Sequence, residues 1–529
     1  MLVFAALIAV IVTPLLLRPA VVDEGDAAQG RTVVIITPHN ETIRREFARG
    51  FARWSRRELG QEIAVEWRSP GGTSEIVRFL RSQFLAGFAR YAAVRGHDLS
   101  AAAARAALQG PPPRADAQTR AATSRARELW LASDVDAAGI DLVFGGGQYD
   151  LHNLARTGAL VDAGLVEAMP ELFATGVIPQ RMAGEVIWDP DGRYYGACLS
   201  SFGICANPDR LRDAGLELPR EWSDLARPEL FGGLALADPT KSGSVTRCFE
   251  LIIQTSMHQA VARAGAAGPA ALDAGWREGL ELIKRMAGNA RSVSDGASEI
   301  PRNVARGDAI AGICIDFYGR TEAEWSAWRS GGRERLIYVS PVGGTSISAD
   351  PIGLLRGAPH RADAIAFIRF VLSVEGQRLW NYRVGAPGGP ERYALRRWPV
   401  RRDLYTPEHR RHFSDPDENP FTIAAEFDYR GAWTGPYFNL IRHTIRAVIL
   451  DPRPELREAW AAIIDAGGPA AVPEAMAAFA WLPYPHHAAD AARAIYAAAP
   501  HERLELRREW TRAAQRAYRR AAALAREGR

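Results

Sequence analysis

The chain has 529 residues, 47% of them hydrophobic, which is enough for two or more domains with proper cores and excludes a disordered polypeptide. The net charge is only +4, with acids and bases interspersed, so composition gives no reason to expect nucleic acid as a partner. The arginine-rich end, residues 502–529, is the exception. Its spacing predicts an exposed amphipathic helix with solvated arginines, and a membrane-surface or partner-docking helix is the alternative.

An apolar segment opens the chain. Residues 2–17 are uncharged and as long as a signal peptide, but they lack a basic leader and a clean A-x-A site. We therefore expect residues 1–30 to be a signal peptide, or an uncleaved membrane anchor, followed by a polar linker. No later run is long and apolar enough to span a membrane. The remainder is expected to be periplasmic or extracytoplasmic, with tethering by an uncleaved segment left open.

The elements that follow alternate strand and helix. The strand at 31–37 leads into a helix, and a second strand at 62–67 leads into another. This order predicts parallel pairing in an α/β sheet. An Ala/Arg-rich segment at about 87–135 interrupts the rhythm and is interpreted as a largely helical insertion, after which the strand pattern resumes at 140–144.

The second half of the chain repeats the pattern. Apolar strand segments are expected from residue 185 onward and again at 233–239, 309–317, 336–341 and 350–356, with helices between them. The tail beyond about 400 is predicted to be mostly helical, with Pro-rich joints.

Four cysteines are too few for a disulfide scaffold and lack the spacing of a zinc site. Export would permit one bridge, with Cys198 and Cys205 as possible partners. The preferred interpretation is that these two, together with Cys248 and Cys314, are small buried apolar residues.

Polar loops follow several predicted strands. In an open α/β sheet, ligands bind beyond the carboxyl ends of the strands. Backbone amides and hydroxyls at the N-termini of the next helices are suited to holding an anion. The loops are TPHNET at 37–42, SPGGTSE at 69–75, GGGQYD at 145–150, DPTKSGS at 238–244 and DFYGR at 316–320.

Lys241 stands out because Lys284 is the only other lysine in the chain. Beside Gly243 and three hydroxyl residues it would offer a compact point charge to an anion. A structural lysine paired with a nearby acid is the alternative. The Walker pattern is absent, so nucleotide hydrolysis is disfavoured.

Taken in order, the segments TPHNET, SPGGTSE, IDLVFGGG, YYGACLSSFGICANPDRL, PELFGGLALADPTKSGS, GDAIAGICIDFYGR, GGTSISADPIGLLRGAP and SVEGQRLW resemble the extracellular solute-binding proteins of ABC importers. The resemblance is to the subgroup related to periplasmic ferric-iron-binding proteins and covers roughly residues 31–400, without the insertion. It implies a two-lobed type 2 periplasmic binding protein fold whose crossing strands lie near Leu199–Cys205 and Thr345–Gly353. It also implies a solute enclosed between the lobes and delivered to a membrane permease.

The expected organisation follows from this resemblance. Beyond residues 1–30 we predict lobe 1 at 31–200 with the insertion at about 87–135, lobe 2 at 201–344, a return to lobe 1 at 345–400, and a helical C-terminal extension at 401–529.

Iron binders of that family hold the metal with a His after the first strand, an acidic residue after the third, and two adjacent tyrosines. Here His39 and Tyr318 match, but the other tyrosine position is Phe317 and the acidic position falls in glycines. Asp316 and Tyr149 are the available substitutes. Hard ferric ion needs anionic oxygen donors, so their loss favours an anionic solute, such as a phosphonate, phosphate ester or carboxylate, over iron. A ferric ion held jointly with an exogenous anion stays open.

We therefore expect an ABC-importer binding protein, monomeric, with no enzymatic activity and no cofactor beyond ferric ion as possible cargo. The alternatives are an exported phosphoryl-handling hydrolase, with the DPTKSGS loop as anion cradle and His39 as base, and a tethered solute sensor. The predicted metal ligands, should the solute be ferric ion, are His39 and Tyr318. The predicted ligand-binding residues are His39, Ser69, Gly71, Gly72, Thr73, Gly146, Gly147, Ser200, Ser201, Thr240, Lys241, Ser242, Gly243, Ser244, Asp316, Tyr318 and Ser346.

Overall fold

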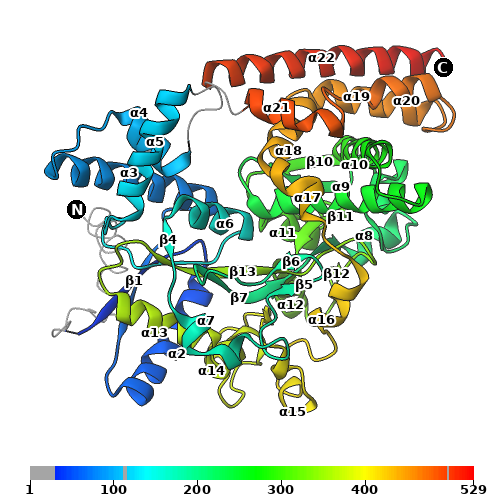
Figure 1. Cartoon of the computed structure of the whole chain (residues 1–529). Helices are drawn as coiled ribbons and strands as arrows, with labels where there is room; N and C mark the ends of the chain where they lie inside the picture. The colour runs from blue at the N-terminus through cyan, green and yellow to red at the C-terminus, as the bar shows by residue number, and fades with distance from the viewer. Residues whose placement is uncertain (1–29, 111–115, 497–499) are drawn as a thin grey trace, which may run out of the picture.

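The computed structural model describes residues 30–110, 116–496 and 500–529 (Figure 1). The predicted signal peptide or anchor lies almost entirely outside these residues. Within them, no helix combines the length and apolar character needed to cross a bilayer.

Lobe 1 is built on a seven-stranded sheet in the order β14-β7-β13-β3-β1-β2, with β4 beside β13. The strands β1 (Thr32–Ile36), β2 (Ala64–Arg68) and β3 (Leu142–Phe144) are parallel, as the sequence predicted, because each is followed by a helix that returns the chain across the sheet. Helices α2 and α13 cover one face, while α3 and α6 cover the other. The remaining bounds are β4 (Leu160–Val161), β5 (Arg181–Met182), β6 (Glu185–Val186), β7 (Tyr194–Ser200), β13 (Ser348–Leu355), β14 (Trp398–Pro399), α2 (Glu41–Leu59), α3 (Thr73–Val94), α6 (Gln148–Thr157), α7 (Leu165–Ala168), α13 (Arg361–Leu372) and α14 (Val374–Asn381).

Lobe 2 holds a five-stranded sheet in the order β10-β9-β11-β8-β12. Helices α9 (Gly243–Ala264) and α10 (Pro269–Asn289) contribute to one continuous core with this sheet. The other bounds are β8 (Phe202–Ala206), β9 (Leu234–Ala237), β10 (Ala290–Ser294), β11 (Ala311–Ile315), β12 (Ile337–Val339), α8 (Pro208–Asp213), α11 (Glu299–Arg306) and α12 (Asp316–Arg329).

Two passages join the lobes at the crossing strands, and a third follows in the C-terminal extension. The chain leaves lobe 1 at the end of β7 and enters β8 through Ser201, and it returns from β12 to β13 through residues 340–347. β13 then pairs antiparallel with β7, so both connections lie next to each other. This confirms the predicted two-lobed fold with crossing hinge strands.

Extra helices extend both lobes, as predicted. Helices α4 (Ala101–Gln109) and α5 (Ala117–Leu131) lie against α3, where Trp130 packs edge-on against Phe84 and Phe88. The insertion therefore begins inside a helix, since α3 continues to Val94.

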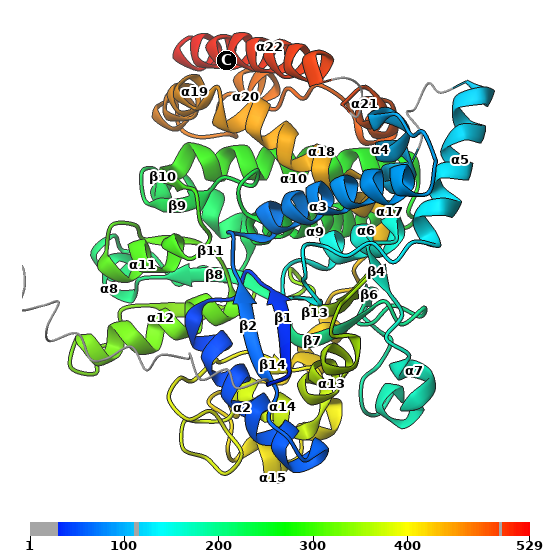
Figure 2. The ribbon, with the colours of Figure 1, turned by 90° about the vertical axis from the view of Figure 1, so that its left-hand side faces the viewer.

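The C-terminal extension divides between the lobes. After β14 has joined the first sheet, the chain runs past lobe 1 through α15 (Pro407–Arg410) and α16 (Pro420–Ile423), and it then joins the core of lobe 2 from Phe427 onward. Its last helices form a layer over lobe 2, at the top of both views (Figures 1 and 2). The bounds are α17 (Gly431–Thr434), α18 (Phe438–Ile445), the π-helical turn η7 (Arg446–Leu450), α19 (Arg453–Asp465), α20 (Pro473–Phe479), α21 (Ala489–Tyr496) and α22 (Pro500–Arg526).

All four cysteines are free and buried. Cys198 lies on β7 in lobe 1 and Cys205 on β8 in lobe 2, and the structure holds no bridge between them. The structure therefore has no Cys198–Cys205 disulfide, and the cysteines are buried as small apolar residues, as the preferred interpretation held.

Candidate functional site

His39 is held rigidly in the loop after β1. Its backbone amide donates to Thr37 Oγ1 over 3.1 Å, and the same hydroxyl donates to the carbonyl of Phe144 over 2.6 Å. The imidazole packs edge-on against the Phe144 ring, with 4.6 Å between ring centroids. The side chain of His39 is thereby fixed at the carboxyl ends of β1 and β3.

The glycine run after β3 is required by this arrangement. Gly145 and Gly146 have φ of 91° and 104°, a region that side chains disfavour. A Cβ on Gly145 would lie 2.5 Å from His39 Nε2, and one on Gly146 would lie 2.7 Å from Thr73 Cγ2. The loops after β1, β2 and β3 therefore converge at one edge of the lobe 1 sheet.

A buried ion pair lies beside the imidazole. Arg397 Nη1 is 2.5 Å from Asp350 Oδ2, and that oxygen is 3.3 Å from His39 Nε2. Arg397 Nη2 donates to Ser200 Oγ over 3.0 Å. We call His39, Ser200, Asp350 and Arg397, together with Tyr318 of lobe 2, the His39 centre.

Lobe 2 reaches this centre through the start of α12. The guanidinium of Arg397 lies 4.2 Å from the centroid of the Phe317 ring, an arrangement that attracts a cation to an aromatic face. The Tyr318 phenol lies within electrostatic range of Arg397 and Asp350. His39 and Tyr318, which come from different lobes, thus flank one ion pair.

The protonation states follow from burial and charge. Burial lowers the pKa of His39, so its imidazole is neutral near pH 7. Burial alone would raise the pKa of Asp350, but Arg397 and His39 outweigh it and the pKa ends below its usual value. Burial raises the pKa of Tyr318. The centre therefore holds a neutral imidazole, a neutral phenol and a carboxylate already paired with arginine.

Further arginines surround the centre. Arg44, on the first turn of α2, is close enough to lower the pKa of His39, and its buried Nε has no hydrogen-bond partner among the described residues. Arg302 of α11 contributes positive charge at Tyr318, and its side chain bonds only to Ser298 among the described residues. Besides Arg397, which pairs with Asp350, Arg44 therefore adds positive charge near His39 and Arg302 near Tyr318, while a second buried carboxylate, Asp316, also lies within electrostatic range of Arg397.

Several predicted residues lie at the same lobe 1 edge. Ser69 Oγ donates to the carbonyl of Thr37 over 2.9 Å, and Thr73 lies against Gly146. Gly72 and Gly147 are the N-caps of α3 and α6, and neither helix has a side-chain cap. Gly71 is exposed beside Gly72. The structure thus brings Ser69, Gly71, Gly72, Thr73, Gly146 and Gly147 close to His39.

Other predicted residues serve the hinge. Ser201 Oγ is 3.0 Å from Tyr338 Oη, and Ser346 Oγ donates to Glu185 over 2.6 Å. Asp316 is fully buried and bound to Arg320 over 2.8 Å. The charge of Asp316 is therefore balanced by Arg320 on the same helix, which argues against Asp316 as the substitute metal ligand that the sequence suggested.

The DPTKSGS loop is organised around its own residues. Thr240 Oγ1 donates to Asp238 over 2.7 Å, and Ser242 is the N-cap of α9. Gly243 and Ser244 form the first turn of that helix, where an added Cβ on Gly243 would meet nothing within 4 Å. Lys241 Nζ lies 2.6 Å from Asp295, with the two side chains 51% and 72% exposed. The structure therefore pairs Lys241 with a surface acid and not with the His39 centre.

Sequence reasoning missed Asp350 and Arg397. Asp350 stands inside the segment that carried the resemblance, although no pattern marked its carboxylate. Arg397 is one of two adjacent arginines before β14, in a chain with arginine at nearly every cationic position. Only the packing of β14 against β7 brings it to the centre.

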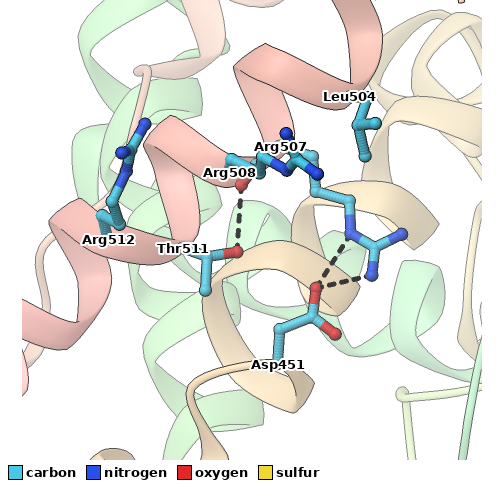
Figure 3. A pocket seen from close by; sticks show the side chains of 6 residues that line it. All are labelled: Asp451, Leu504, Arg507, Arg508, Thr511 and Arg512. Atoms are coloured by element: carbon cyan, nitrogen blue, oxygen red, sulfur yellow. Dashed lines mark hydrogen bonds and ion pairs between the residues drawn. The ribbon is translucent and has the colours of Figure 1, made fainter. Parts of the chain in front are cut away.

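A hollow on the surface lies elsewhere, at the C-terminal helices. Its volume is about 420 Å³, and it is lined by residues of α22 and by Asp451. Figure 3 shows the Arg507 guanidinium directed at Asp451, at 2.8 Å, so this arginine is already neutralised. The hollow is on the C-terminal layer, away from the strand ends of both sheets, and we do not assign the solute to it.

Known proteins resemble parts of this chain. Residues 158–395 match the family model described as bacterial extracellular solute-binding protein. An uncharacterised protein of Haemophilus influenzae is 25% identical over 238 residues, which are 45% of this chain and 60% of that protein. The phosphoglycerate transport regulatory protein PgtC of Salmonella typhimurium is 22% identical over 181 residues, 34% of this chain and 39% of its own. The chain thus spans about 60% and 39% of the lengths of these curated relatives.

Solved structures show the same kind of likeness. Iron-bound HitA from Pseudomonas aeruginosa aligns with 78% of this chain and 98% of its own, at 15% identity and a TM-score of 0.45. AfuA from Actinobacillus pleuropneumoniae, with exogenous fructose-6-phosphate bound, aligns with 66% and 82%, at 18% identity and a TM-score of 0.41. Residues 158–395 are thus similar to bacterial extracellular solute-binding proteins, and the two lobes with crossing strands are features of this chain's own fold.

Proposed function

We propose that this protein captures a small anionic solute between its lobes, at the His39 centre and the adjoining glycine loops. The solute class is a phosphate ester, a phosphonate or a carboxylate. The observation that carries the proposal is that Asp350 is already paired with Arg397, while Arg44 near His39 and Arg302 near Tyr318 add further positive charge.

The neighbouring helix ends support the same choice. Helices α3 and α6 begin at Gly72 and Gly147 without a side-chain cap, so their first backbone amides have no side-chain acceptor. Amides at a helix N-terminus carry partial positive charge and bind anions. Both helices start at the sheet edge where His39 lies, so their backbone amides would donate hydrogen bonds to an anion there in addition to those from the arginines.

A ferric ion paired with an exogenous anion is the second candidate, because His39 and Tyr318 flank one centre as the resemblance implied. Arg397 counts against it, since this guanidinium already occupies Asp350 and would repel a trivalent cation. No group of three His, Cys, Asp or Glu side chains suited to a metal occurs in the described part of the chain. The name of PgtC, which links that relative to phosphoglycerate transport, agrees better with an anion.

In this proposal the protein is the extracytoplasmic binding component of an ABC importer. It acts as a monomer, performs no chemistry on the solute, and delivers it to a membrane permease when the lobes close. The family match supports the binding role and the location outside the cytoplasm.

The test is a set of affinities measured by calorimetry on residues 31–529 with inorganic phosphate, a phosphate ester, a dicarboxylate and ferric citrate. Arg44→Ala is expected to weaken binding of the preferred anion about tenfold to a hundredfold, the worth of one charge-assisted hydrogen bond of about 1.5–3 kcal/mol. Arg45→Ala is the matched control, because Arg45 is exposed on the same helical turn.

Equal affinity of the wild type and Arg44→Ala for every anion would overturn the anion assignment, as would stabilisation by ferric citrate alone. Enzymatic turnover is followed in the same samples. A binding protein gains thermal stability from its solute without consuming it, whereas the hydrolase alternative would release phosphate from the ester.

A further inference from the structure

Residues 427–446 of the C-terminal extension, which we call the strap, are anchored firmly in lobe 2. Tyr437, Leu440 and Ile441 belong to the same hydrophobic core as the lobe 2 sheet. Thr434 Oγ1 donates to Glu250 of α9 over 2.6 Å and accepts from Gln254 Nε2 over 2.7 Å. The strap therefore moves with lobe 2.

The strap also touches the glycine loop of lobe 1. The ring of Phe438 stacks on Tyr149, with 4.6 Å between centroids and 29° between planes. Asn439 Nδ2 donates to Tyr149 Oη over 3.0 Å. Tyr149 stands on the first turn of α6, and Figures 1 and 2 both place α6 beside the α17–α18 segment.

A second contact with lobe 1 lies at the turn of the β5–β6 hairpin. The Tyr429 amide donates to the carbonyl of Ala183 over 2.9 Å. Gly184 has φ of 82°, and a Cβ there would lie only 1.9 Å from the Tyr429 carbonyl oxygen. The Tyr429 hydroxyl in turn donates to Glu250 over 2.8 Å. One tyrosine thus links the hairpin of lobe 1 to α9 of lobe 2.

Charges connect the strap to one polar loop from each lobe. Arg446 forms an ion pair with Asp238, which begins the DPTKSGS loop of lobe 2. Arg442 faces Asp150 of the GGGQYD loop of lobe 1, where its charge opposes the effect of burial on the carboxyl group. Arg446 therefore interacts with a carboxylate of lobe 2, and Arg442, one helical turn earlier, interacts with a carboxylate of lobe 1.

From these contacts we infer that the strap is a latch that holds the two lobes closed in the absence of solute. Opening about the crossing strands has to break the Phe438–Tyr149 stack and the Tyr429–Ala183 hydrogen bond, because the strap is part of the lobe 2 core. The solute must therefore exchange through a rare opened state, and its association is slower than in a binding protein without such a strap. The inference rests on the two-lobed fold and not on the identity of the solute.

The experiment measures the distance between the lobes without solute. Spin labels are placed by Arg45→Cys on α2 and Arg277→Cys on α10, both exposed positions, and the native thiols are buried. The otherwise unchanged labelled protein is expected to give one narrow distance distribution. The double substitution Phe438→Ala and Asn439→Ala is expected to add a second, longer population.

Two further variants make the result decisive. Tyr149→Phe removes the hydroxyl acceptor but keeps the ring stack, and a smaller long-distance population is expected. Arg519→Ala breaks only an ion pair with Glu455 inside the extension and should leave the distribution unchanged. Identical distributions for the parent and the double variant, both folded by circular dichroism, would overturn the inference, and so would a broad distribution in the parent.

Discussion

At the residue scale, the proposed anion site depends on the charges of the His39 centre. Arg397 is 2% exposed, and its bond to Asp350 leaves the carboxylate unable to act as a free metal ligand. The neutral imidazole of His39 and phenol of Tyr318 then provide hydrogen-bonding groups without negative charge. In the proposed function the centre binds an anion, because Arg44 near His39 and Arg302 near Tyr318 add positive charge beside the Arg397–Asp350 pair.

Lys241 gives a sharp residue-level prediction. Its ion pair with Asp295 is exposed, so it contributes at most about 1 kcal/mol to folding. We expect Lys241→Ala to leave the solute affinity unchanged within about twofold, measured by calorimetry. A loss of about 1.5–3 kcal/mol in binding would instead mean that the lysine leaves Asp295 and bonds to the solute.

Lys284 predicts a pH dependence of stability. Its ammonium is fully buried and donates to the carbonyl of Phe479 over 3.0 Å, and burial lowers its pKa from 10.5 to about 7. At a pH between these two pKa values, the Lys284 side chain is protonated in the unfolded chain and neutral in the folded chain. Stability should therefore rise with pH from about 7 toward 10.5.

Urea unfolding between pH 6 and 10 measures this slope, with Lys284→Met as the matched variant. The unfolding free energy of the wild type should increase with pH relative to that of the variant. A difference that is flat across this range would contradict the lowered pKa.

At the scale of elements, the glycine loop between β3 and α6 places His39 and Thr73 in contact with its backbone. Gly145→Ala combines an unfavourable φ with a Cβ at 2.5 Å from His39 Nε2. Gly164→Ala has a similar φ of 74° but nothing within 4 Å, so it isolates the cost of the backbone. Gly164→Ala should lose about 1 kcal/mol of folding stability. Gly145→Ala should lose more, because its Cβ also meets the buried His39 ring.

Only Gly145→Ala should also displace the imidazole and weaken solute binding. Thermal unfolding and calorimetry of the two variants separate these effects. Equal solute affinities would show that His39 does not contribute to binding through its present position.

At the scale of the whole molecule, the extension changes what a two-lobed protein can do. Beyond the crossing strands, residues 396–418 also tie the lobes together. Arg396 pairs with Glu324 of α12 over 3.1 Å, and Arg320 of α12 pairs with Glu418 over 3.0 Å. Together with the strap, these contacts join the lobes at places outside the crossing strands.

Much of this architecture was predictable from local patterns. Alternating strand and helix signals indicated the parallel strands β1, β2 and β3, because a crossover helix has to return the chain to the same edge, whereas the sequence patterns predicted no strand at β10 of lobe 2. The order of the segments predicted the two crossings at β7–β8 and β12–β13. The helical character of the insertion and of the extension followed from composition, although the structure begins the insertion inside α3.

The site was less predictable, and Arg397 and Lys241 show why. Local residue patterns are enough to predict polar, glycine-rich loops after the strands, since they specify strand ends and helix starts. Which cations lie beside these loops depends on the fold, because ion pairs form between residues brought together by packing. That packing placed Arg397 against Asp350 and His39, and paired Lys241 with Asp295 at the surface.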